Sequence, residues 1–208
     1  MLVSLSGSAA GSQGDDPAEK SAKVAHMTKF PVHTIDSAPE GAKPALQQLQ
    51  AAFGMIPNIL GTMATSPVLI SSLVGLFGKV HGGSFSEAQV QIVLLTDAVT
   101  NKSEWAVAFH TALALTEGID AADVEAIREG RLPADRKLAA LSALAKTMIE
   151  RRGRVDDKDV DGFLAAGFGK DHVLEVIAIV AASTITNYTG SVTHPPLEAP
   201  FQKYAWAA

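Results

Sequence analysis

The chain has 208 residues, a length that indicates one domain or at most two small ones, and its 47% hydrophobic and 19% charged residues indicate a globular rather than a disordered chain. A net charge of -5 with no basic block argues against nucleic acids and anionic membranes as partners. The absence of cysteine excludes disulfides, thiolate nucleophiles, iron–sulfur clusters and cysteine-based zinc sites. The longest apolar stretch, residues 173–182, contains Glu175 and is too short to span a membrane, so we expect no transmembrane segment.

The start of the chain differs in composition from the rest. Gly, Ser, Ala, Asp and Lys dominate residues 6–23, and the apolar run at residues 2–5 is too short for a signal-peptide core. We therefore predict a flexible tail over residues 1–26, or extra sequence upstream of a natural start at Met27. A single domain over residues 27–208 follows.

Beyond the tail, apolar residues recur at the three- and four-residue spacing of helices. Ser66 before Pro67 is typical of a helix start, and Ser86 with Gln89 matches a capping box. Asn101 to Glu104 offers a further cap. The predicted helices cover residues 44–53, 67–81, 90–99, 105–115, 121–128, 133–152, 155–166 and 171–188, and an extended tail is expected after residue 194.

Strand signals are nearly absent, because the β-branched residues follow helical spacing and do not alternate. The sequence therefore predicts an all-α domain of roughly eight helices.

One segment of the helical region carries a resemblance to a known family. The residues from Asn101 to His110, Asn-Lys-Ser-Glu-Trp-Ala-Val-Ala-Phe-His, resemble the core of the carboxymuconolactone decarboxylase and alkylhydroperoxidase AhpD-like family. That family typically shows Asn-x-Cys-x-x-Cys-x-x-x-His on the corresponding helix, with a Glu about three turns upstream. Here the cysteine positions fall on Ser103 and Ala106, and the Glu position falls on Gln91.

Shorter matches at residues 30–33, 53–58 and 193–201 resemble the peroxidase-related branch of this family, so the resemblance extends over residues 28–205. It implies the AhpD-like helical fold, with an antiparallel helix pair over residues 86–117 at its core. Members of the family form dimers, trimers or hexamers. Together with the slightly positive mean hydropathy, this leads us to expect a homo-oligomer.

The departures from the family pattern bear on the chemistry. In the AhpD type, a thiolate attacks the O–O bond of a hydroperoxide and a second cysteine closes a disulfide. Ser103 and Ala106 supply neither thiol, and Gln91 cannot act as a base. Thiol-peroxidase chemistry is therefore excluded unless a partner supplies the sulfur. The decarboxylase reaction of the family, a proton transfer on a lactone acid, needs no cysteine and stays open.

The candidate catalytic residues are accordingly His110, Ser103 and Gln91. His110 follows Ser103 by seven residues and therefore shares its helix face. His110 is either a proton shuttle or a buried structural histidine, and we expect it to be neutral, buried and within hydrogen-bonding reach of Ser103 or Gln91. Ser103 is otherwise expected to bond a free N–H in the first helical turn. Glu87, one turn before Gln91, offers an alternative acid.

Three further side chains receive structural interpretations. Asp97 and Glu104 are expected to be solvated or capping carboxylates, and Trp105 is expected to form a pocket wall or to pack in the core. The remaining histidines are too scattered for a metal motif, so no metal site and no cofactor are predicted.

Two functions stay open. The first is non-thiol acid/base chemistry on a small organic substrate, and the second is a catalytically degenerate small-molecule-binding or assembly protein. A cytoplasmic homo-oligomer with a small-molecule ligand, and with neither nucleic-acid nor membrane partners, is the expectation in both cases.

Overall fold

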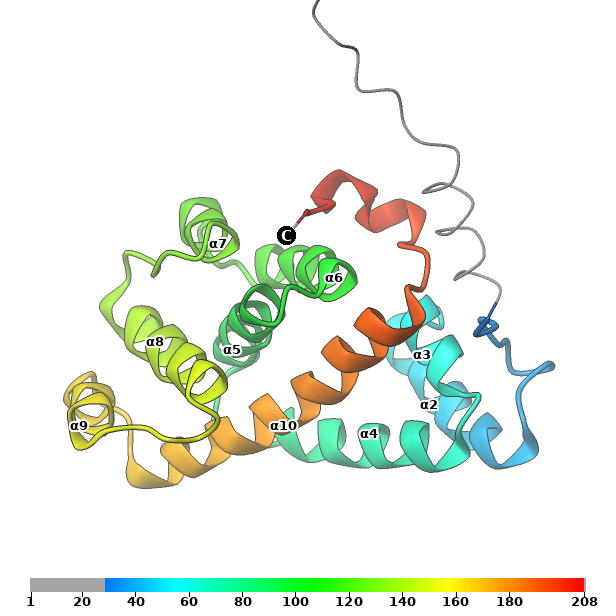
Figure 1. The fold of residues 1–208 in the computed structure, drawn as a ribbon, viewed down its shortest axis with the longest axis horizontal. Coiled ribbons are helices and arrows are strands. Elements are labelled where there is room, and N and C mark those ends of the chain that lie inside the picture. Colours follow the sequence, from blue (N-terminus) through cyan, green and yellow to red (C-terminus); the bar gives the residue numbers. More distant parts are fainter. Residues whose placement is uncertain (1–28, 208) are drawn as a thin grey trace, which may run out of the picture.

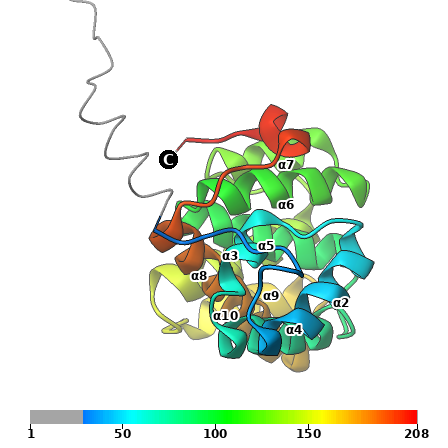
Figure 2. The same ribbon diagram turned by 90° about the vertical axis from the view of Figure 1, so that its right-hand side faces the viewer.

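The computed structural model describes residues 29–207, so the tail predicted over residues 1–26 lies outside the described part of the chain. Within residues 29–207 there is no strand, and eight helices have seven residues or more (Figures 1 and 2). The predicted all-α architecture is confirmed. The elements are, in order, the 3-10 helix η1 (Glu40–Ala42), α2 (Lys43–Phe53), α3 (Asn58–Met63), α4 (Pro67–Val80), α5 (Glu87–Thr100), α6 (Glu104–Thr116), α7 (Ala121–Arg128), α8 (Arg136–Glu150), α9 (Asp157–Ala165), α10 (Lys170–Thr193) and the 3-10 helix η2 (Ala199–Tyr204).

Two helix starts form as the sequence predicts. The Ser66 hydroxyl accepts a hydrogen bond from the backbone N–H of Leu69 at 3.3 Å and so begins α4. At the start of α5, the Ser86 hydroxyl accepts from the Gln89 N–H, and the Gln89 side-chain oxygen accepts from the Ser86 N–H at 3.1 Å. Both caps satisfy N–H groups that have no partner inside the helix.

Several predicted boundaries are wrong. Helix α5 begins at Glu87, three residues before its predicted start, and α3 lies outside every predicted helix. Helix α8 begins at Arg136 and not at residue 133, because the Asp135 carboxylate accepts from two N–H groups of the first turn at 2.9 Å. Helix α10 continues to Thr193, five residues beyond the prediction, and its late threonine hydroxyls donate to carbonyls one turn back. The expected extended tail instead contains η2, which is followed by Trp206, whose indole N–H donates to the Arg128 carbonyl at 3.1 Å.

Helix α5 lies in the interior of the bundle in both views (Figures 1 and 2). It packs against α6, α7, α8 and α10, and all of its residues from 90 to 98 are buried. The tight connection of residues 101–103 turns the chain back, so that α6 pairs with α5 as an antiparallel neighbour. Lys102 adopts a left-handed conformation in this connection, with φ of 55°.

The turn between α4 and α5 is fastened to α10. The Glu175 carboxylate accepts hydrogen bonds from the Ser84 N–H at 2.9 Å and from the Ser84 hydroxyl at 2.7 Å. A Cβ atom on Gly83 would lie 2.9 Å from the Glu175 Oε2 atom, so a side chain at this position would displace the Glu175 carboxylate. The end of α4 is thereby held next to the start of α5.

Helix α10 runs diagonally across the molecule and contacts α3, α4, α5, α6, α8 and α9 (Figure 1). By length and composition alone, its 24 residues could cross a membrane. The shorter apolar stretch at residues 173–182, considered by itself, is too short to do so. The packing of α10 against six other helices is that of a core helix of the bundle.

Candidate functional site

A cavity of about 370 Å³ lies between α2, α4, α5 and α6. Most of its wall is apolar, and four aromatic rings contribute to it, those of Phe53, Phe77, Trp105 and Phe109. The polar side chains in the wall are Gln48, His81, Glu87, Gln91, His110, Glu117 and Thr186. A cavity of this size with few polar groups is typical of a small-molecule site.

The paired helices α5 and α6 bring Gln91 and His110 together in the wall of this cavity. The His110 Nδ1 atom lies 3.0 Å from the Gln91 Oε1 atom, and both side chains are buried. Because an amide oxygen only accepts, the neutral imidazole carries its proton on Nδ1 and keeps a lone pair on Nε2. The expected contact between Gln91 and His110 is thus confirmed.

Burial lowers the pKa of His110 from 6.5 to about 3, and the charge of His81 contributes to the same shift. His110 is therefore neutral at pH 7, as predicted. A base with this pKa exchanges protons poorly at neutral pH, whereas its hydrogen-bonding capacity is unaffected. These properties suit His110 to hydrogen bonding of a ligand.

Ser103 is not brought to His110. It occupies the N-cap position of α6, where its side chain makes no capping bond, so the expected bond to a first-turn N–H is wrong. Its buried hydroxyl has no hydrogen-bond partner within residues 29–207. It lies close to Gly190 on α10, where an added Cβ atom would be 3.3 Å from the hydroxyl oxygen. Neither Ser103 nor Ala106 is among the residues that line the cavity.

Asp97 on α5 is completely buried, so the interpretation as a solvated carboxylate is wrong. Neither of its carboxyl oxygens has a hydrogen-bond partner in the described part of the chain. Burial raises the pKa of Asp97 well above its ordinary value. The Asn187 amide donates to the Ser183 hydroxyl at 3.1 Å. Glu104, in contrast, is exposed in the first turn of α6.

Sequence reasoning missed the pairing of His81 with Glu87. The His81 Nδ1 atom lies 2.8 Å from the Glu87 Oε2 atom, and the two side chains are 33% and 43% exposed. The His81 ring stacks on Phe77 with centroids 5.5 Å apart. The available signal was their six-residue separation across the Gly82–Gly83 pair.

Trp105 lines the cavity, as one of its two predicted interpretations has it. Its ring stacks on Phe109 with centroids 4.8 Å apart, and its N–H donates to the Glu198 carboxylate at 3.0 Å. Glu198 also accepts from the Asn58 N–H at 2.5 Å, so the C-terminal segment fastens α3 and the aromatic wall together.

Comparison with known proteins identifies the fold. No family profile and no curated protein matches the sequence. A peroxidase-related protein with an alkylhydroperoxidase AhpD core from Ralstonia eutropha JMP134 has a similar structure, with 14% identity, a TM-score of 0.74 and coverage of 84% of this chain and 94% of that chain. A peroxidase-related protein from Silicibacter sp. TM1040 is similar at 16% identity and a TM-score of 0.71, covering 84% and 93%.

A variant of the debrominase Bmp8 in which one cysteine is replaced by alanine, in complex with 2,3,4-tribromopyrrole, is likewise similar, with 16% identity and a TM-score of 0.71 over 85% of this chain and 95% of that chain. The chain therefore has an AhpD-like fold, as the sequence resemblance predicted. It combines this fold with a complete absence of cysteine.

Proposed function

We propose that the chain binds a small, largely apolar aromatic molecule in the cavity beside His110, and that acid/base chemistry without a thiol is the reaction class open to it. The observation that carries the proposal is a neutral imidazole, fixed by Gln91, in the wall of an otherwise apolar cavity. The lone pair on His110 Nε2 can accept a hydrogen bond from an O–H or N–H group of the ligand.

The aromatic wall supports a ring-shaped ligand. Trp105 and Phe109 are stacked on each other, and Phe53 meets Phe109 edge-on with centroids 5.9 Å apart, so the cavity offers preformed aromatic surfaces. The complex of Bmp8 with 2,3,4-tribromopyrrole supports the proposal further, because it places a small halogenated ring in a protein of the same fold.

Binding is tested by calorimetric titration with 2,3,4-tribromopyrrole. Leu113→Trp fills the cavity and is expected to lower the affinity at least tenfold, whereas Leu132→Trp, at an exposed position outside the cavity, is the matched control. Equal affinity of both variants and the unaltered chain, or no binding by the unaltered chain, would contradict the proposal.

The alternative function is binding or assembly without turnover. The two are separated by following the chemistry of a bound compound, for which a carboxylated lactone is the relevant probe of proton transfer. Release of carbon dioxide that Leu113→Trp abolishes and Leu132→Trp retains supports the enzyme. Binding without any change in the compound supports the degenerate protein.

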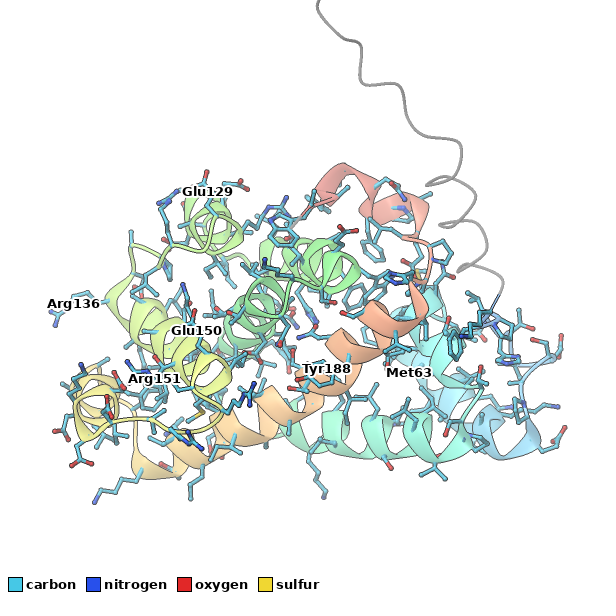
Figure 3. The ribbon with its side chains drawn as sticks, in the orientation of Figure 1. Met63, Glu129, Arg136, Glu150, Arg151 and Tyr188 are labelled. Atoms are coloured by element: carbon cyan, nitrogen blue, oxygen red, sulfur yellow. The ribbon has the colours of Figure 1, made fainter. Side chains whose placement is uncertain are left out.

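A homo-oligomer is the second part of the proposal, with a second copy of the chain covering the outer face of α10. Leu174, Ile177, Tyr188 and Val192 are exposed by 67%, 52%, 62% and 60%, and Tyr188 is labelled in Figure 3. Residues 176–193 contain no charged side chain. Uncharged apolar surface of this extent is typical of an interface between subunits.

Light scattering during size-exclusion chromatography tests the assembly. The unaltered chain is expected to elute at a multiple of 21.7 kDa, and the double variant Ile177→Lys, Tyr188→Glu is expected to elute as a monomer. A monomer of the unaltered chain over a wide concentration range would refute the oligomer, as would binding of this face to lipid vesicles instead of to a second copy.

A further inference from the structure

We propose that His81, held by Glu87, is the group that exchanges a proton with a weakly acidic aromatic ligand in the cavity, while His110 only accepts a hydrogen bond from it. This inference rests on the proposed binding function and assigns the proton transfer to a pair that the sequence resemblance does not mark.

The geometry of the pair leaves one imidazole nitrogen available. Glu87 accepts a hydrogen bond from the His81 Nδ1–H at 2.8 Å, and it thereby fixes the tautomer of the neutral ring. The Nε2 atom then carries a lone pair. This is the only hydrogen bond of the His81 ring within residues 29–207, and the side chain is 33% exposed, so Nε2 is free to meet a ligand or water.

The pair is also held in position. His81 is the C-cap residue of α4, Glu87 is the first residue of α5, and the turn between them is fastened by Glu175 through its two bonds to Ser84. Stacking of His81 on Phe77 orients the imidazole plane. A carboxylate and an imidazole fixed in this way form the arrangement of a general base with its orienting partner.

Electrostatics decides which histidine takes the proton. Four titratable side chains line the cavity: His81, Glu87, His110 and Glu117. A positive charge on His81 is balanced by the Glu87 carboxylate in direct contact. A positive charge on His110 would be buried, would face only the neutral Gln91 amide and would be repelled by His81. The proton therefore goes to His81.

The ligand class follows from this arrangement. A phenol or a halogenated pyrrole has an apolar ring for the aromatic wall and one weakly acidic O–H or N–H group. In the transfer, that O–H or N–H bond breaks, its electron pair stays on the ligand heteroatom, and a new N–H bond forms at His81 Nε2. The step reverses without any further reactant.

Nitrogen-15 spectroscopy of the histidine rings tests the inference, with His81→Gln used to assign the His81 signals. The probes are 2,4,6-tribromophenol and its non-acidic analogue of similar shape, 1,3,5-tribromobenzene. The titration is run at a pH where the free protein has His81 neutral. Tribromophenol is then largely ionised in solution, so it binds with the uptake of one solvent proton, which is expected on His81 Nε2. Tribromophenol is expected to move the His81 Nε2 signal to the range of a protonated nitrogen, and tribromobenzene is expected to bind without this change. The His110 Nδ1 proton should stay in place with both probes.

Two variants sharpen the test. Glu87→Gln is expected to abolish the protonation of His81 in the complex that is saturated with tribromophenol. Glu117→Gln removes a carboxylate from the same cavity without touching the His81 hydrogen bond, and it is expected to retain the protonation. Protonation of His110, or protonation of His81 that survives Glu87→Gln, would overturn the inference alone. Failure of both probes to affect any cavity signal would overturn the proposed binding function as well.

Discussion

Gln91 and Asp97 lie on the same helix, six residues apart, and both are buried, yet their surroundings differ sharply. Gln91 bonds His110, and this pair opens on an apolar cavity. The Asp97 carboxyl group has no hydrogen-bond partner within residues 29–207 and lies among the helices without reaching that cavity. A buried polar group becomes a candidate site only when a partner fixes it and a cavity gives a ligand access to it.

The same physical cause acts on both regions with opposite sign. Burial disfavours the charged form, so it lowers the pKa of His110 to about 3 and raises the pKa of Asp97. Both groups are therefore stabilised in their neutral forms. The comparison predicts opposite dependences of the folding stability on pH.

The largest expected effect belongs to His110. Its pKa is lower in the folded chain than in the unfolded chain, so the unfolded chain binds more protons and stability is lost as the pH falls below 6.5 toward about 3. Between pH 7 and pH 4 this loss amounts to roughly 3 kcal/mol. His110→Gln has no titrating group here and lacks this loss. In urea unfolding, the free energy of unfolding of the variant should therefore rise relative to that of the unaltered chain as the pH falls. A difference between the two that does not change with pH would contradict a neutral, buried His110.

Asp97 is expected to act in the opposite direction. Its pKa is raised on folding, so the folded chain binds more protons, and stability is lost as the pH rises from 3.8 through the folded-state pKa. Asp97→Asn has a similar shape and no charge, and it should stabilise the fold at pH 8 but not at pH 3.5. Thermal unfolding at the two pH values measures this. A gain that is equal at both would show that Asp97 is not a buried titrating group.

A third prediction concerns the partner of His110. Gln91→Leu removes the acceptor and leaves the His110 Nδ1–H unsatisfied in a buried position, which is expected to cost about 1–3 kcal/mol of unfolding free energy. Urea unfolding at pH 7 gives the value, and the double variant with His110→Phe should recover much of the loss. Additive losses in the double variant would show that the two side chains do not interact.

The smallest effect is expected at Ser103. Its buried hydroxyl has no partner within residues 29–207, so Ser103→Ala gives up no hydrogen bond and should change the unfolding free energy by less than about 0.5 kcal/mol, or should stabilise the fold. Urea unfolding at pH 7, as for Gln91→Leu, measures the difference between the variant and the unaltered chain. A loss above about 1 kcal/mol would reveal a bound water or partner group at this hydroxyl, by the usual magnitude of such bonds.

Local signals predicted the helices well where a cap defines them, as at Ser66 and Ser86. The start of α8 was misplaced because the Asp135 cap is the stronger signal, and Pro133 precedes it. The sequence does not predict η2, because the contacts that hold this segment come from residues far away in the sequence. Arg128, on a distant helix, donates to the Tyr204 carbonyl at 3.1 Å and accepts from the Trp206 indole.

The candidate site was predictable only in part. The antiparallel pairing of α5 and α6 follows from the short connection between them, and it placed Gln91 opposite His110 correctly. The contact of His81 with Glu87 depends on the conformation of the turn at residues 82–84, which the sequence does not specify. The sequence predicts a solvated Asp97, because charged side chains are rarely buried without a partner. The structure buries Asp97 because it belongs to a stretch of nine consecutive buried residues of α5.

The proposed site depends on a neutral His110 that is fixed by Gln91 and offers a hydrogen-bond acceptor to a small aromatic ligand. Nitrogen-15 spectra of the His110 ring at pH 5, recorded with and without 2,3,4-tribromopyrrole, test it most directly. We expect a neutral ring protonated on Nδ1 in both spectra, with the Nε2 signal shifted when the pyrrole is present. A doubly protonated ring at pH 5, or an Nε2 signal that the bound pyrrole leaves unchanged, would contradict it.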